Sequence, residues 1–224
     1  MLLLDVKNRR WSREMCDVCG ISEQMLPKLH ESYEVVGMLK QEIADKFGLK
    51  DVKIIAGAGD NAAAAVGTGV VGEGGCNISL GTSGTLFVSS SSYKEDKVNA
   101  LHSFCHADGG WHLMGCILSA ASCNSWWVNG ILQSTDYKKE EDGLDEVIGQ
   151  NDVYFLPYLM GERSPHNDVT ARGAFIGMRP DTTRKMMTLA MLEGVTFALR
   201  DCLEAAKKNG AVIPRTKLCG GGAK

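Results

Sequence analysis

The sequence contains no long hydrophobic run and no excess of charge of one sign. Its longest apolar stretches fall far short of the roughly 20 residues that a membrane-spanning helix needs. The formal net charge is −3, so the composition indicates no surface for nucleic acid or for an anionic membrane. No basic segment precedes an apolar signal core, and we therefore expect a cytoplasmic protein.

Proline is scarce as well, and no proline-rich linker, internal repeat or low-complexity tract divides the chain. The 224 residues are enough for one large domain or parts of two. With 44% hydrophobic and 23% charged residues, the composition is that of a globular protein with a sizeable core. We expect a boundary within VVGEGG (70–75), which gives predicted domains 1–74 and 75–224.

Eight cysteines are present, but they do not follow the pattern of a disulfide framework. Cys16 and Cys19 form a single CxxC pair without a second pair, which is a weak zinc or redox signal. A mixed group lies in strand-like sequence: His102, Cys105, His106, His112 and Cys116. Neighbouring strand side chains point to opposite faces, so five converging ligands are not expected. We predict reduced, mostly buried thiols and no metal site, and the role of this group stays open.

Hydrophobic periodicity and turn residues predict the secondary structure. Strands are expected at 1–6, 52–55, 111–117, 153–159, 173–177 and 216–219, with a hairpin over 77–90. Helices are expected at 12–20, 22–26, 35–48, from Asp60 onward, at 120–132 and 137–149, and from a Thr182 or Thr183 cap to about Lys208. The last helix carries an apolar stripe typical of core: Met187, Ala190, Met191, Gly194, Phe197, Ala198 and Cys202.

A lone acid, Asp60, stands where the strand at 52–55 meets an alanine-rich helix. One interpretation is a helix cap, because an aspartate oxygen accepts an orphan backbone N–H at this position. Ser, Thr or Asn would cap at similar stability, however. The small neighbouring residues also leave the carboxylate accessible to a ligand, which is the functional interpretation.

The sequence around this acid, from Gly57 to Ala62, matches the G-x-G-x-x-A pattern of a dinucleotide-binding turn. Two features argue against a nicotinamide cofactor. A carboxylate at the helix start would repel the pyrophosphate from the backbone N–H groups that should hold it. No acid follows about 20 residues later to bind the ribose.

Two further glycine-rich corners follow. Gly81-Thr82-Ser83-Gly84 (GTSG) can direct backbone N–H groups and two hydroxyls toward a phosphate, although a plain hairpin turn fits the same four residues. Gly220-Gly221-Gly222, after the last strand, could let a nucleotide lie against bare backbone. Two such corners in one chain with a lone acid favour phosphoryl transfer, in which an aspartate accepts the proton of the substrate hydroxyl.

Six segments together carry a family resemblance. In chain order they are GAGDNAAAAVGTGVV, SLGTSGTLFV, HSFCHA…WHLMGCILSAASC, FLPYLMGERSPHND, GAFIG and LCGGGA. They resemble the xylulokinase branch of the FGGY carbohydrate-kinase family, over nearly the whole chain. The resemblance implies an α/β protein of the actin-like ATPase (ribonuclease H-like) fold, with two domains that close over sugar and ATP. One position departs from the family's second signature: Met186 stands where a polar residue is usual.

Site residues follow from this resemblance by position. Asp60 corresponds to the catalytic base and sugar contact, and Asn61 to its sugar-binding neighbour. The remaining matches are ATP-binding: Gly81, Thr82, Ser83, Gly84, Gly220, Gly221 and Gly222. The implied activity is ATP-dependent phosphorylation of D-xylulose to D-xylulose 5-phosphate, with ATP and Mg²⁺ as cofactors. A homodimer is an open option.

Alternatives remain at this point. Ribulose, gluconate and glycerol kinases are near relatives, and a non-kinase actin-like ATPase represents another class. The family's first phosphate motif does not precede Asp60, so the resemblance implies an internal fragment: the end of the sugar-binding domain (1–74) and a truncated ATP-binding domain (75–224). Such a fragment is expected to lack kinase activity on its own. For the loop GERSPHND, with Arg163, His166 and Asp168, two interpretations stay open: it contacts the substrate or the facing domain, or it is a solvated loop held by Pro165.

Overall fold

A five-stranded sheet forms the centre of the chain from residue 75 onward. The computed structural model describes residues 2–98 and 100–223. The strand order is β11–β5–β6–β8–β7; β11 runs parallel to β5 and the other pairs are antiparallel. The strands are β5 (Gly75–Leu80), β6 (Gly84–Ser90), β7 (His102–Cys105), β8 (Trp111–Ile117) and β11 (Arg215–Cys219). The predicted hairpin over 77–90 is thus β5–β6.

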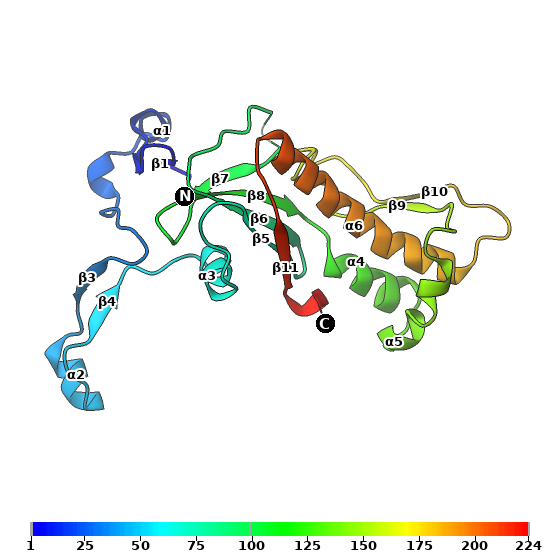
Figure 1. The fold of residues 1–224 in the computed structure, drawn as a ribbon, viewed down its shortest axis with the longest axis horizontal. Helices are drawn as coiled ribbons and strands as arrows, with labels where there is room; N and C mark the ends of the chain where they lie inside the picture. The colour runs from blue at the N-terminus through cyan, green and yellow to red at the C-terminus, as the bar shows by residue number, and fades with distance from the viewer. Residues whose placement is uncertain (1, 99, 224) are drawn as a thin grey trace.

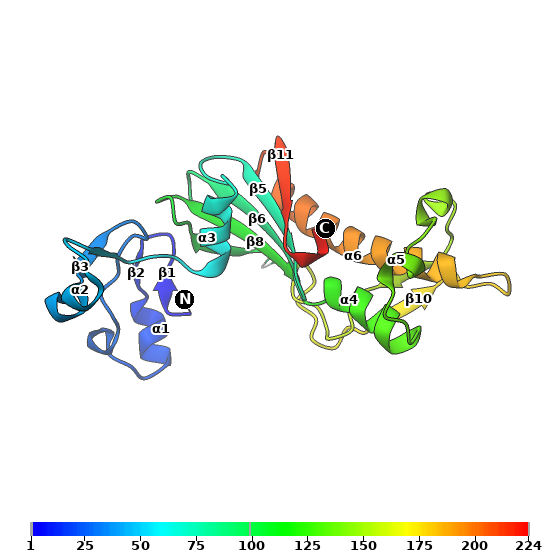
Figure 2. The ribbon, with the colours of Figure 1, turned by 90° about the horizontal axis from the view of Figure 1, so that it is seen from below.

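The long helix α6 (Arg184–Lys208) packs along one face of this sheet (Figures 1 and 2). It begins at Thr183, whose side chain accepts the N–H of Met186, so one of the two predicted caps is correct. Alternate residues of β6, Leu86 and Val88, face the helix and join Cys202 in the core. Most of the predicted apolar stripe therefore lies in the core. The prediction is wrong for Phe197, which is 46% exposed.

A second core lies between the other end of α6 and a small hairpin of β9 (Tyr154–Leu156) and β10 (Ala174–Ile176). Trp127 and Phe155 are buried there. The segment before the hairpin contains α4 (Ala121–Ser125), a π-helical stretch η2 (Trp126–Ile131), α5 (Tyr137–Glu140) and η3 (Leu144–Val147). The predicted helix over 120–132 is approximately correct, but the one over 137–149 is two short pieces, interrupted at Gly143, which has φ 64°.

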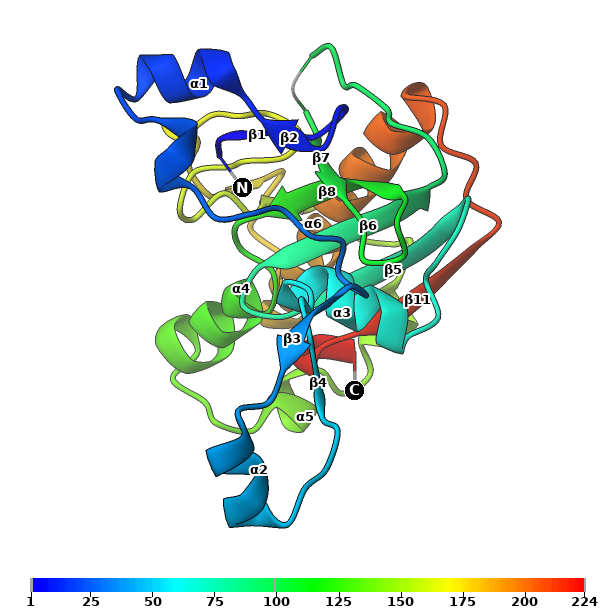
Figure 3. The same cartoon turned by 90° about the vertical axis from the view of Figure 1, so that its left-hand side faces the viewer.

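The first part of the chain contains β1 (Leu4–Asp5), β2 (Arg10–Trp11), α1 (Arg13–Val18), η1 (Glu23–Met25), β3 (Val35–Met38), α2 (Gln41–Phe47), β4 (Lys53–Ile55) and α3 (Asp60–Gly67). The segment with β3, α2 and β4 extends away from the sheet (Figures 1 and 3), whereas α3 packs on the sheet and the β1–β2 turn contacts β8 through the Val6 carbonyl. The strand predicted at 1–6 is shorter and pairs with β2. The helix predicted over 35–48 is wrong for its first part, because the chain there pairs with β4 as β3. In the part that is helical, α2, the apolar residues Ile43 and Phe47 are exposed.

Helix α3 lies on the sheet face opposite to α6 (Figure 2). Its Ala65 and the following Val70 pack on Phe87, whose side chain points away from Leu86 and Val88. Lys217 of β11 also donates a hydrogen bond to the carbonyl of Thr68. The helix that starts with Asp60 is thereby fixed to the sheet. Within the described residues, none of the helices is long and apolar enough to cross a membrane.

Candidate functional site

The side chain of Asp60 is exposed at the start of α3. After β4 the chain turns at Gly57 (φ 79°), and Gly59, not Asp60, is the N-cap residue. The carboxylate accepts only the N–H of the next residue, Asn61, at 2.8 Å. No cation among residues 2–98 and 100–223 forms an ion pair with it. Asp60 is therefore not the helix cap, and it is an exposed residue with small neighbours on both sides.

The GTSG corner, the β5–β6 turn, is held by the segment 118–122 between β8 and α4. The Thr82 carbonyl accepts the N–H groups of Ala120 (3.0 Å) and Ser122 (3.3 Å) and the Ser122 hydroxyl (2.8 Å). Ser83 donates its hydroxyl to the Leu118 carbonyl at 3.2 Å. The Thr82 side chain itself is exposed. The corner is thus fixed from one side and presents Thr82 on the other.

Glycine is required at two positions in these corners. A Cβ on Gly84 would lie 2.8 Å from the Ile117 side chain. Gly220 has φ 90°, and its Cβ would lie 2.5 Å from the Leu80 carbonyl oxygen. Gly222 also lies against Leu80, the residue before Gly81. The structure therefore brings the two predicted ATP-binding corners together.

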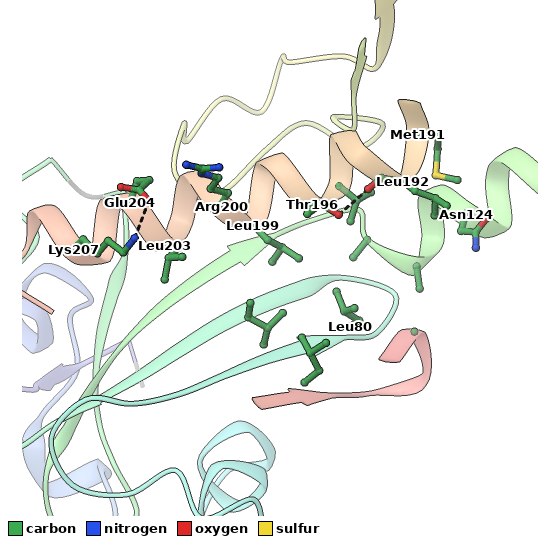
Figure 4. A pocket seen from close by; sticks show the side chains of 16 residues that line it. Leu80, Asn124, Met191, Leu192, Thr196, Leu199, Arg200, Leu203, Glu204 and Lys207 are labelled. Carbon is green, nitrogen blue, oxygen red and sulfur yellow. Dashed lines mark hydrogen bonds and ion pairs between the residues drawn. The ribbon is translucent and has the colours of Figure 1, made fainter. Parts of the chain in front are cut away.

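An apolar groove of about 590 Å³ adjoins the two corners, between α6 and strands β5 and β11 (Figure 4). Leu80 and Gly222 line its corner end, and the ion pair of Glu204 with Lys207 (3.0 Å) lies at the other. Four α6 side chains line its wall: Leu192, Val195, Leu199 and Leu203. The sequence prediction missed this groove. The sequence did contain a signal for it: these four residues form a second apolar stripe on α6, in addition to the predicted stripe that packs in the core.

Asp60 and the groove lie on different faces of the sheet. Helix α3 packs on Phe87, whereas the groove is on the α6 side. Within the described parts of the chain, no hydrogen bond or ion pair joins Asp60 to either glycine corner. The structure thus brings together the residues that were predicted to bind ATP. The predicted base, Asp60, does not lie with them.

Of the histidines in the mixed group, His106 and His112 are neighbours, with ring centres 5.7 Å apart, and His102 has a different partner. His102 accepts a hydrogen bond from Arg163 (2.8 Å), and burial, with the nearby guanidinium, lowers the pKa of His102. His112 stacks on Phe87 (3.9 Å between ring centres), and burial lowers the pKa of His112 to about 3. His106 contacts the Val70 carbonyl at 2.9 Å.

The cysteines show no metal-ligand arrangement. No group of three metal-ligating side chains occurs in the described part of the chain. Cys16 is buried and Cys19 exposed, while burial raises the pKa of Cys123 and of Cys202 to about 12. Buried thiols of this kind are chemically inert.

Sequence profiles of one family match the chain in two parts. The N-terminal domain of the FGGY family of carbohydrate kinases matches residues 1–67, and its C-terminal domain matches residues 76–224. The predicted domain boundary after Gly74 falls between the two matches and stays a prediction.

Similar proteins fall in the same family. A xylulose kinase of Escherichia coli (strain K12) is 40% identical over 99% of this chain, which covers 46% of that protein. A crystal structure of a xyloylose kinase from Brucella ovis has 42% identity and a TM-score of 0.93, over 99% of this chain and 46% of the other. A gluconate kinase from Lactobacillus acidophilus has 28% identity and a TM-score of 0.84, over 98% and 45%.

These comparisons confirm the predicted α/β fold of actin-like ATPase type. The chain spans about half the length of the relatives that it matches. The two domain matches together cover most of its residues, and both domains are those of FGGY carbohydrate kinases. The chain is a member of the FGGY family of carbohydrate kinases.

Proposed function

We propose that the protein that carries this chain is an ATP-dependent sugar kinase that phosphorylates D-xylulose to D-xylulose 5-phosphate. One observation carries the proposal: the chain is 40% identical along 99% of its length to a xylulose kinase. The accessible carboxylate of Asp60 and the paired glycine corners support it, because phosphoryl transfer needs a base for the hydroxyl proton and a cradle for the phosphates.

In this proposal ATP binds at the two glycine corners. Gly84 and Gly220 allow close backbone packing that a Cβ would prevent, and the exposed Thr82 presents a hydroxyl and backbone groups to a phosphate. Gly221 has no atom within 4 Å of its would-be Cβ, which leaves room for a ligand. In this proposal, Gly81–Gly84 contact the phosphates and Gly220–Gly222 the adenosine.

Asp60 is the proposed general base, with Asn61 as the adjacent sugar contact. A carboxylate without an ion pair can accept the proton of a sugar hydroxyl that lies within hydrogen-bond distance. Mg²⁺ is bound in such enzymes largely by substrate phosphates, with one or two carboxylates. We assign no protein ligand to it.

Other sugars of the family are the second candidate. The gluconate kinase structure superposes on the chain with a TM-score of 0.84, so the fold alone does not select xylulose. A non-kinase ATPase represents a different class, but it has no use for the sugar-facing acid that Asp60 is proposed to be. A cytoplasmic location and a homodimer remain part of the proposal.

A substrate panel tests the proposal. The whole protein is incubated with ATP and Mg²⁺ and with D-xylulose, D-ribulose, gluconate, glycerol or no sugar, and ADP and sugar phosphate are measured. We expect kcat/KM for D-xylulose to exceed that for the other sugars. A higher kcat/KM for gluconate would show that the protein is a gluconate kinase and not a xylulose kinase. Equal ADP formation with and without sugar would show that it is an ATPase and not a sugar kinase.

A further inference from the structure

A buried carboxylate outside the predicted site, that of Glu162, lies in the connection from β9 to β10. It is 2% exposed, and its Oε1 accepts the N–H of Leu118 (3.0 Å) and of Arg163 (2.7 Å). Its Oε2 has no hydrogen-bond partner among the described residues. Burial raises the pKa of Glu162, although the two N–H donors oppose this.

The loop that carries Glu162 is fixed to the sheet independently of that side chain. The Glu162 N–H donates to the Asp168 carbonyl at 2.8 Å, across the loop. The Ser164 N–H donates to the Cys116 carbonyl of β8 at 3.0 Å. The carboxylate therefore projects from an anchored loop toward the end of β8, where Leu118 begins the segment 118–122.

Segment 118–122 is the support of the GTSG corner. Four of the contacts that hold the corner come from it: three to the Thr82 carbonyl and one from Ser83 to Leu118. Ala121 adds a fifth by donating its N–H to the Gly81 carbonyl at 3.0 Å. A continuous series of hydrogen bonds thus runs from Glu162 through Leu118 to the corner.

A carboxylate at this buried position is not explained by stability alone. Removing an ionisable group from water is costly, and well-packed apolar side chains often stabilise a core as well or better. An apolar residue would, however, leave the Leu118 N–H at the end of β8 without its acceptor. The acid is thus suited to fix the segment that supports the corner.

We propose that Glu162 is a positioning residue for nucleotide binding: by fixing segment 118–122, its carboxylate holds Gly81–Gly84 in the shape that accepts the phosphates of ATP. Glu162 touches neither corner, so it acts through Leu118. This inference rests on the proposed ATP-binding function of the corner. Its structural part, the coupling of Glu162 to the corner, is measurable without nucleotide.

Amide hydrogen exchange of the 224-residue chain without ATP measures this coupling. The reporters are the amides of Ala120, Ala121 and Ser122, which donate to the corner. In Glu162→Ala we expect their exchange to accelerate by at least about tenfold relative to the sheet amides of Leu86 and Val88, the factor for one lost hydrogen bond to a charged group. Glu162→Gln keeps an acceptor oxygen and should restore most of the protection.

Asp96 provides a matched control. It is also a buried acid, 7% exposed, and accepts the N–H groups of Val98 (3.1 Å) and Leu101 (2.7 Å); within the described residues it has no hydrogen bond to segment 118–122 or to the corner. Asp96→Ala should destabilise the chain without accelerating amide exchange at 120–122 relative to the sheet amides. If Glu162→Ala does not fold, Glu162→Asp, with its shorter side chain, replaces it. Equal reporter exchange in wild type and in the folded Glu162 variant overturns the proposal.

ATP affinity gives the second readout. By titration calorimetry we expect Glu162→Ala to weaken ATP binding by about tenfold and Glu162→Gln to restore it. An unchanged affinity in Glu162→Ala overturns the proposal. If wild type itself binds no ATP, the proposed role of the corner fails, and exchange at 120–122 still decides whether Glu162 fixes it.

Discussion

Arg163 and His102 lie 61 positions apart, and a hydrogen bond of 2.8 Å from the guanidinium Nε to the imidazole Nε2 joins them. The bond connects the GERSPHND loop to β7, the strand that carries the sequence HSFC. It requires an unprotonated Nε2, which agrees with the lowered pKa of His102. Arg163 is thus tied to the sheet and is not merely part of a solvated loop.

A double-mutant cycle measures this connection. His102→Leu, Arg163→Met and the double variant are unfolded in urea at pH 7.5. We expect a coupling energy of about 1 kcal/mol, because a hydrogen bond from a charged donor stabilises by roughly 1.5–3 kcal/mol and both side chains retain some exposure. Additive effects of the two substitutions would show that the contact contributes nothing to stability.

Gly194 sets the distance between α6 and β9. A Cβ at this position would overlap the carbonyl oxygen of Phe155. Gly194→Ala should therefore destabilise the protein by about 1–3 kcal/mol or more, the usual cost of overpacking, as measured by urea unfolding. Gly67→Ala in α3, which meets no atom within 4 Å, is the control and should be neutral or slightly stabilising. Equal stability of the two variants would contradict the close approach.

His112 should make stability depend on pH. Its pKa falls from 6.5 to about 3 in the folded chain, mainly because it is buried; His106 lowers it further and Asp108 opposes the change. The unfolded chain therefore binds a proton below pH 6.5 that the folded chain does not, so stability decreases as the pH falls through this window. At about 1.4 kcal/mol per pH unit, the loss at pH 5 is on the order of 2 kcal/mol.

Urea unfolding at pH 7.5 and pH 5 checks this sign and size. His112→Phe keeps an aromatic ring between Phe87 and Phe104 and should remove most of the difference. A wild-type pH dependence in His112→Phe would assign the effect to other groups.

Local chemistry made much of this fold predictable. Ser12 and Thr183 cap their helices, and Gly48 ends one in the left-handed conformation, as expected from residues that act through their nearest neighbours. The wrong helix prediction at 35–38 arose where contacts distant in sequence determined the structure. Val35 and Val36 are β-branched residues that favour a strand, and pairing with β4 outweighed the helical pattern of the residues that follow.

The candidate site was predictable only in part, for the same reason. GTSG and the triple glycine are visible in the sequence because glycine is required locally. Their contact through Leu80 depends on the parallel pairing of β11 with β5. Glu162 gave no sequence signal, since its role depends on a strand end 44 positions away. A charged residue in a polar loop is usually exposed, and burial reversed that expectation.

Thr82→Val tests the ATP corner without disturbing its support. Valine keeps the branched shape and the backbone carbonyl that accepts three hydrogen bonds, but lacks the exposed hydroxyl. We expect ATP binding to weaken by about tenfold, as for one lost hydrogen bond to a phosphate, with unchanged stability. Thr68→Val, at the C-cap of α3, serves as the control for affinity alone, because its hydroxyl donates to the Ala64 and Ala65 carbonyls and not to the corner. Unchanged affinity in Thr82→Val would favour an ordinary hairpin turn.

Asp60→Asn tests the proposed base. The amide has nearly the same shape, and its oxygen can still accept the Asn61 N–H, while Gly59 remains the cap, so α3 should be retained. An amide cannot take a proton from the sugar hydroxyl. Turnover with D-xylulose in the whole protein should therefore fall by about 10²–10⁴-fold, the usual contribution of a positioned general base, while ATP affinity stays the same.

Glu42→Gln controls for the loss of charge at a helix start. Glu42 is in the first turn of α2 as Asp60 is in that of α3, and both are exposed. Each substitution removes a similar interaction with the helix dipole, about 0.3–1 kcal/mol. Only Asp60→Asn should change turnover. Wild-type turnover in Asp60→Asn would leave that carboxylate without a catalytic role, whereas an equal decrease in both variants would trace the effect to the fold instead of the proton transfer.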